Sequence, residues 1–81
     1  MRRLRILVID DEEGVRQLIQ QAIEPTFEVH LARHGQEGLD LVRAVHPHLI
    51  LLDLRMPGLD GLEVLARLKA NERTRMIPVV I

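Results

Sequence analysis

The stretch that decides the fold is LILLDLRMPGLDG, residues 49–61. Residues 49–52 form a short apolar run that ends at Asp53, and such a run is typical of a strand buried on both faces of a parallel sheet. Pro57 and Gly58 then predict a tight turn, because proline fixes φ at the first corner and glycine tolerates a positive φ at the second. Open α/β sheets bind ligands at the carboxyl ends of their strands, so Asp53 is a candidate functional residue.

The rest of the chain alternates strand and helix patterns around this stretch. Apolar runs predict strands over residues 4–9, 27–32 and 76–81, and the strict alternation within 27–32 favours a half-exposed edge strand. We expect three helices, with these apolar positions facing the sheet: Val15, Leu18, Ile19, Ala22 and Ile23; Leu41, Val42 and Val45, within residues 35–45; Leu62, Leu65 and Leu68. The order βαβαβαβ predicts an α/β, doubly wound parallel sheet with strand order 2-1-3-4.

Two prolines and one glycine refine the predicted helices. Pro25 and Pro47 each stop the preceding helix, since the residue before proline resists the α region. Gly38 lies inside the second helix, where we expect it to cost about 1 kcal/mol against alanine.

Composition narrows the function classes. The chain has 81 residues, a net charge of −1, no cysteine, and Phe27 as its only aromatic residue. With one aromatic residue the chain has no platform for base stacking, and its net charge gives no overall attraction to nucleic acid or membrane. Without cysteine it can form no disulfide and no thiolate metal site. The basic start MRRLR is followed by an apolar run too short for a signal peptide or a membrane span, so we expect a cytoplasmic domain.

Three carboxylates follow two strands that the predicted order makes neighbours. Asp10 and Asp11 end the first strand, and Asp53 ends the third. Two charges 4 Å apart repel by about 4 kcal/mol at an effective dielectric constant near 20, so the cluster must take up protons or hold a cation. An all-oxygen site that keeps water ligands favours magnesium, beside which a carboxylate can attack a phosphoryl group.

These acids also have a structural interpretation. An Asp pair after a strand is often a helix N-cap, and Asp53 alone could start a turn. Gly14 stands where a capping box after Asp11 would need Glu or Gln, however, and caps do not explain three acids at adjacent strand ends. Asp60, three residues before Glu63, instead fits a helix cap.

Other polar groups receive a structural interpretation. The four histidines, at 30, 34, 46 and 48, have no metal-binding spacing with an acid on one helix face. The basic residues from Arg67 to Arg75 suit a solvated helix C-terminus. No phosphate-binding glycine loop occurs in the sequence.

The segments VIDDEEG (8–14) and LLDLRMPGLDGLEVL (51–65) resemble the receiver domain of two-component response regulators, a flavodoxin-like fold. The resemblance extends over ARHGQEGLDLV (32–42) and IPVVI (77–81). It implies that Asp53 accepts a phosphoryl group from a histidine kinase or phosphotransfer protein. It also implies Mg²⁺ bound directly by Asp11, mainly through water by Asp10, and by the backbone carbonyl of Arg55.

The family pattern also includes a hydroxyl residue after strand four and a lysine after strand five. Neither Thr26, Thr74 nor Lys69 matches those places, and the chain has no serine. We therefore expect residues 1–81 to be a receiver domain incomplete at its C-terminus, truncated after strand four and weakly phosphorylated alone. A parent protein would add a C-terminal output domain, and a homodimer could complete the sheet.

Two other functions remain open at this point. A magnesium-dependent phosphohydrolase could use Asp53 as nucleophile, although such enzymes usually carry an acid two residues later, where this chain has Arg55. A receiver-like interaction module that takes no phosphate would fit the missing hydroxyl and lysine. The intact acids at 10, 11 and 53 favour the signalling function over both.

Overall fold

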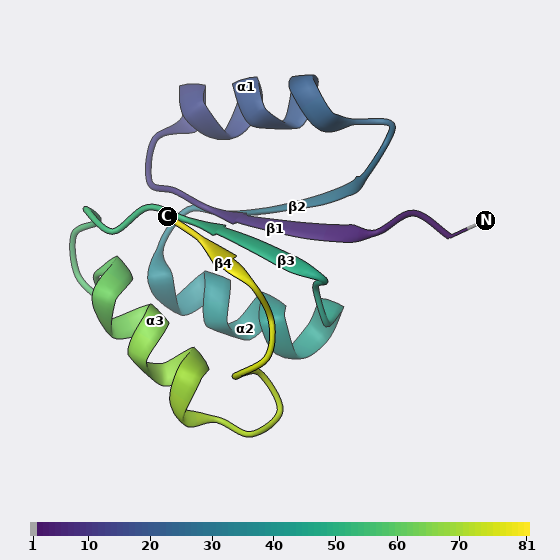
Figure 1. Ribbon diagram of the computed structural model, residues 1–81. Coiled ribbons are helices and arrows are strands. Elements are labelled where there is room, and N and C mark those ends of the chain that lie inside the picture. Colours follow the sequence, from purple (N-terminus) through teal and green to yellow (C-terminus); the bar gives the residue numbers. More distant parts are fainter. Residues whose placement is uncertain (1) are drawn as a thin grey trace.

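The computed structural model describes residues 2–81 and contains one parallel sheet between two helical layers (Figure 1). The sheet order is β2-β1-β3-β4, and every neighbouring pair is parallel, which confirms the predicted topology. The elements are β1 (Arg5–Ile9), α1 (Glu13–Ile23), β2 (Glu28–Ala32), α2 (Gly35–Val45), β3 (Leu49–Leu52), α3 (Gly61–Ala70) and β4 (Val79–Val80). Of the helices in residues 2–81, none combines the length and the hydrophobicity that crossing a membrane requires.

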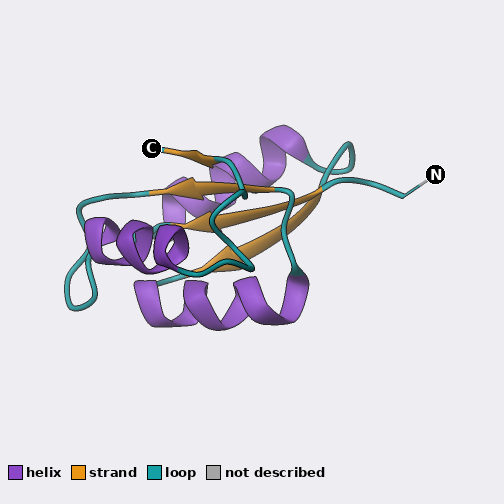
Figure 2. Ribbon diagram, turned by 60° about the horizontal axis from the view of Figure 1, so that its bottom comes forward, coloured by secondary structure: helices purple, strands orange, loops and turns teal. Residues whose placement is uncertain are grey.

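The two faces of the sheet are covered unequally. Helices α2 and α3 pack on one face and α1 lies alone on the other, as the two views of the ribbon show (Figures 1 and 2). The main core lies on the side of α2 and α3, because alternate residues of β1 and β3 point there. Its buried members are Leu7, Ile9, Ala32, Val42, Ile50, Leu52, Met56, Val64 and Leu68.

The prediction for the first helix was partly wrong. Leu18, expected to face the sheet, is 68% exposed, and Ala22 is exposed as well. Ile19 is half-buried, and the buried residue of this helix is Arg16. Since residues 2–81 place no second helix beside α1, only the side chains directly above the strands become covered.

The apolar stripe of α3 agrees with the prediction at Leu68, which is buried, and at Leu65, which packs half-buried against the core, but not at Leu62. Leu62 is 62% exposed, whereas Gly61, Val64 and Leu68 are buried. The helix is rotated so that its glycine lies against the backbone at the end of β3. Close backbone contact at Gly61 thus turns the first turn of α3 so that Leu62 points away from the core.

Strand β4 is shorter than the predicted segment 76–81. Residues 71–77 instead form turns, in which the Arg75 N–H donates to the Asn71 carbonyl at 2.8 Å and the Ile77 N–H donates to Thr74 at 3.0 Å. Lys69 Nζ donates to the carbonyls of Arg75 and Ile77, at 3.0 and 3.1 Å. These contacts hold the segment in turns rather than in an extended conformation. Hydrogen bonding to β3 begins where the Pro78 carbonyl accepts from the Ile50 N–H at 3.0 Å, and residue pairing begins at Val79.

Gly38 has a role that helix propensity does not reveal. A Cβ at this position would lie 2.5 Å from Ile9 Cδ1 and 2.8 Å from its Cγ1. Gly38 thus lets α2 approach β1 closely. The predicted weak position in the helix is a packing requirement.

Candidate functional site

The ends of β1 and β3 bring three carboxylates together. Ile9 is paired with Leu52 in the register, so Asp10 and Asp53 follow at the same edge of the sheet. The Asp53 N–H donates to the Ile9 carbonyl at 2.9 Å, which ties the two strand ends. One oxygen from each of Asp10, Asp11 and Asp53 lies within 4.8 Å of the others. The convergence expected from the strand order is therefore present.

Local turns hold two of these carboxylates in place. Asp10 Oδ1 accepts from the Glu12 N–H at 2.9 Å, and Asp53 Oδ1 accepts from the Arg55 N–H at 2.9 Å. In residues 2–81 no hydrogen bond occupies the second oxygen of either side chain, or the exposed carboxylate of Asp11. These oxygens are the ones free to bind a cation or to attack an electrophile. The Arg55 carbonyl remains a predicted ligand in the same turn.

Arg16 is a site residue that the sequence interpretation missed. Its buried side chain reaches from α1 to the end of β1, where Nη1 donates to the Asp10 carbonyl at 2.8 Å. This contact fixes the backbone that carries Asp10 and Asp11. Arg16 lies three and seven residues before Ile19 and Ile23, and that spacing on the apolar face was the signal that could have identified it.

The loop after β3 is shaped by residues with steric roles. Gly58 has φ of +74°, as the Pro57-Gly58 turn predicts. A Cβ on Gly61 would collide with the backbone of Asp53 and Leu54, so only glycine lets α3 start this close to the acid. The predicted cap is confirmed as well, because Asp60 Oδ1 accepts from the Glu63 N–H at 2.9 Å.

The histidines make structural contacts and are not part of the acid cluster. His34 Nδ1 accepts from the Glu37 N–H at 3.2 Å and so caps α2, and His46 ends the same helix with φ of 54°. His48 Nδ1 accepts from the Arg5 N–H at 2.9 Å, and His30 Nε2 lies 2.7 Å from Glu28 Oε2.

The chemistry of the site follows from the atoms that could bind a metal ion. Three carboxylate oxygens without nitrogen or sulfur ligands suit a hard divalent cation, and partial exposure leaves room for water ligands, which favours Mg²⁺. A hollow of about 220 Å³ adjoins Asp10 and Asp53 on the α1 side, and its other lining residues are apolar: Val8, Ile9, Ile19, Leu51, Leu52, Val80 and Ile81. The acids are thus accessible at the rim of a largely apolar hollow.

Comparison with known proteins identifies one protein family. The model of the response regulator receiver domain matches residues 6–81. Protein-glutamate methylesterase/protein-glutamine glutaminase 2 of Rhodopseudomonas palustris is 46% identical over 67 residues, which are 80% of this chain and 18% of that protein. Sporulation initiation phosphotransferase F of Bacillus subtilis is 37% identical over 75 residues, 90% of this chain and 60% of the relative.

Solved structures agree on the fold. The N-terminal domain of a response regulator receiver protein from Methanoculleus marisnigri aligns with a TM-score of 0.89 at 37% identity. The alignment covers 93% of this chain and 62% of that one. The chain therefore spans less than two thirds of the length of these relatives.

Proposed function

The chain belongs to the response regulator receiver domain family, and on that premise we propose that Asp53 accepts a phosphoryl group from a phosphohistidine in a magnesium-dependent transfer. The observation that carries this proposal is the approach of the Asp10, Asp11 and Asp53 carboxylates to within 4.8 Å. A divalent cation would offset the repulsion between like charges this close, and phosphoryl transfer needs such a cation as well.

The geometry supports a division of roles within Asp53. Its Oδ1 is held by the Arg55 N–H, so the other carboxylate oxygen is the nucleophile. That oxygen forms the bond to phosphorus while the bond between phosphorus and the donor's imidazole nitrogen breaks. The imidazole leaves with the electron pair, and Asp53 becomes an acyl phosphate.

Asp10 and Asp11 would bind the cation that this transfer requires. A Mg²⁺ ion bound by the two residues, by Asp53 and by the Arg55 carbonyl would offset the negative charge on the transferred oxygens. Arg16 keeps the Asp10 backbone in place through its hydrogen bond to the carbonyl. The role of the chain is thus that of a signalling module whose state is set by phosphorylation, rather than an enzyme that releases a product.

The proposed partners follow from the family. A histidine kinase or phosphotransfer protein would supply the phosphoryl group. The similarity to a fraction of a much longer methylesterase supports a parent protein in which this unit controls an output domain. Pairing with a second copy along the free edge of the sheet remains a further prediction.

A labelling experiment tests the proposal. With acetyl phosphate as donor, we expect magnesium-dependent acyl phosphate on the chain, weak for residues 1–81 and stronger in a longer parent protein. Asp53→Asn should abolish it, whereas Asp60→Asn should not, because asparagine also caps a helix well. Labelling that survives in Asp53→Asn, or that needs no divalent cation, would refute the proposal.

A further inference from the structure

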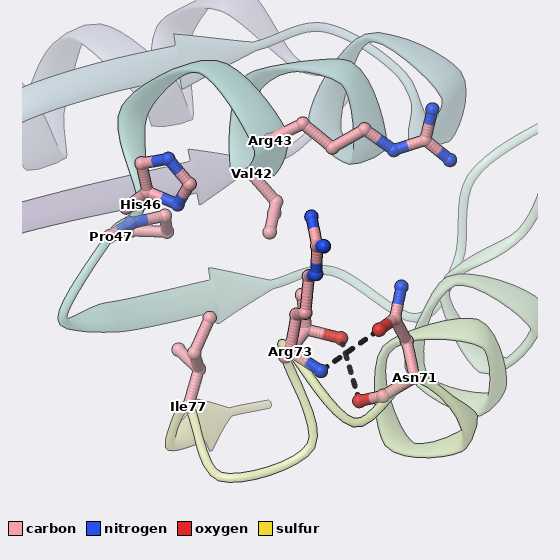
Figure 3. A pocket seen from close by; sticks show the side chains of 8 residues that line it. Val42, Arg43, His46, Pro47, Asn71, Arg73 and Ile77 are labelled. Carbon is pink, nitrogen blue, oxygen red and sulfur yellow. Dashed lines mark hydrogen bonds between the residues drawn. The ribbon is translucent and has the colours of Figure 1, made fainter.

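A second pocket lies at the other end of the strands from the acid cluster, where β3 and β4 begin (Figure 3). It has a volume of about 530 Å³ and is formed by the C-terminal end of α2 and the loop after α3. Its lining residues are Val42, Arg43, His46, Pro47, Asn71, Arg73, Thr74 and Ile77. None of these residues takes part in the acid cluster.

The floor and the rim of this pocket differ in polarity. Val42 and Pro47 are buried and Ile77 is half-buried, so the floor is apolar. Arg43 and Arg73 are exposed, and Figure 3 shows the Arg73 side chain extending from the loop toward α2. An apolar floor below a charged rim suits a peptide side chain flanked by groups of opposite charge.

The nearby cations are not equivalent. Arg67 is paired with Glu63 at 3.1 Å, and Lys69 is used by the carbonyls of its own loop. Within residues 2–81, Arg43 and Arg73 form no ion pair. The basic end of α3, expected to be only a solvated surface, therefore contributes one unpaired guanidinium to the pocket, and α2 contributes the other.

The remaining rim groups also favour an anion. Asn71 Oδ1 accepts from the Arg73 N–H at 2.9 Å, which leaves the Asn71 amide NH₂ as a donor (Figure 3). The hollow that continues over the rim is lined by three arginines, Arg43, Arg67 and Arg73, and by one carboxylate, Glu72. This part of the surface is positive although the chain as a whole has a net charge of −1.

We propose that this α2–α3 pocket binds an acidic peptide segment of a partner protein. An apolar side chain of the segment occupies the floor at Val42 and Ile77, and neighbouring carboxylates bind Arg43 and Arg73. Nucleic acid is disfavoured as the occupant, because the pocket offers no aromatic ring for base stacking. The pocket lies where the strands begin and the acid cluster lies where they end, so a partner can bind in the pocket without covering Asp53.

Fluorescence anisotropy on the 81-residue chain tests this proposal. The probe is a short fluorescein-labelled peptide with glutamates on both sides of a leucine pair. Two matched peptides replace either the glutamates by glutamine or the leucines by serine. The double variant R43E/R73E is compared with R3E/R33E, which changes the net charge equally outside the pocket.

We expect the acidic peptide to bind the wild-type chain more weakly as salt rises, and R43E/R73E to bind it at least about tenfold more weakly at low salt. R3E/R33E and the phosphoacceptor variant D53N should bind as the wild type does. The glutamine and serine peptides should both bind more weakly. Circular dichroism confirms that each variant is folded.

Three results would overturn the proposal. Equal loss in the two double variants would mean a nonspecific charge effect. Equal binding of the serine peptide would remove the role of the apolar floor. Tighter binding of a single-stranded oligonucleotide, lost in R43E/R73E, would assign the pocket to nucleic acid. Because D53N is part of the comparison, failure here is distinguishable from failure of the proposed phosphorylation.

Discussion

Replacing Asp11 by asparagine should stabilise the chain without magnesium and destabilise it, relative to wild type, when magnesium is abundant. Asp11 is the clearest position for this test, because it is exposed and within residues 2–81 its carboxylate has no hydrogen-bond partner. Asp10 and Asp53, in contrast, accept hydrogen bonds that hold their turns. The asparagine variant removes one charge and little else.

The expected change in the free energy of unfolding follows from the distances between the carboxylates. At the 4.8 Å limit that separates the oxygens, two unit charges repel by about 0.9 kcal/mol in water and about 3.5 kcal/mol at an effective dielectric constant of 20. Exposure places Asp11 near the lower value, and salt screens it further. We therefore expect Asp11→Asn to raise the free energy of unfolding by about 1 kcal/mol in a chelator, or about 4–8 °C in Tm.

Magnesium should make the wild-type chain more stable than Asp11→Asn. At ten times its Kd, the ion stabilises the wild-type chain by about 1.4 kcal/mol, and a variant that has lost one ligand gains much less. Thermal unfolding followed by circular dichroism, with EDTA and across a magnesium titration, measures both effects. Asp40→Asn removes the same charge outside the cluster and should show no crossover.

The electrostatic reasoning would fail if Asp11→Asn were less stable than wild type in the chelator. It would also fail if the variant kept the full magnesium response. Either outcome would mean that the three carboxylates do not form one coupled site.

Three further predictions follow from other contacts. Gly38→Ala should lower stability by about 1 kcal/mol or more in chemical denaturation, because overpacking against Ile9 exceeds the gain in helix propensity; a more stable variant would contradict the close packing. Arg16→Met should lower stability by about 1.5–3 kcal/mol and weaken magnesium binding by losing the hydrogen bond to the Asp10 carbonyl, whereas Arg16→Lys should restore part of the affinity; equal magnesium titrations in all three proteins would remove its positioning role. The Arg33 N–H donates to Glu37 and holds the pKa of that carboxyl below its ordinary value of 4.5, so its stabilising effect is present above this pH and is lost as pH falls through the lowered pKa. Glu37→Gln should therefore flatten the acid limb of a pH-dependent unfolding series by less than about 1 kcal/mol, and an unchanged acid limb would argue against the contact.

The sequence by itself determined the order of elements, the parallel sheet and the edge position of β2. These features depend on local patterns: the period of apolar residues, the glycine and proline positions, and short connections that permit few topologies. It also determined the convergence of the acids, because residues that follow adjacent parallel strands must meet at one edge. The Asp60 cap and the positive φ of Gly58 are equally local, and both were predicted correctly.

Tertiary structure alone decided which apolar residues of α1 and α3 become buried, whereas the predicted inward residues of α2 are buried or half-buried as expected. The exposure of Leu18 and Leu62 depends on which elements lie beside α1 and α3, and the hydrophobic pattern of one helix does not say what those neighbours are. The same applies to Gly38, whose cost in a lone helix becomes a packing advantage against Ile9. Arg16 reaches the Asp10 carbonyl, six residues away, only because α1 packs on the sheet. Arg43 and Arg73 line one pocket because segments distant along the chain lie side by side. A residue's partners across space are set by packing, whereas its local pattern sets only the element to which it belongs.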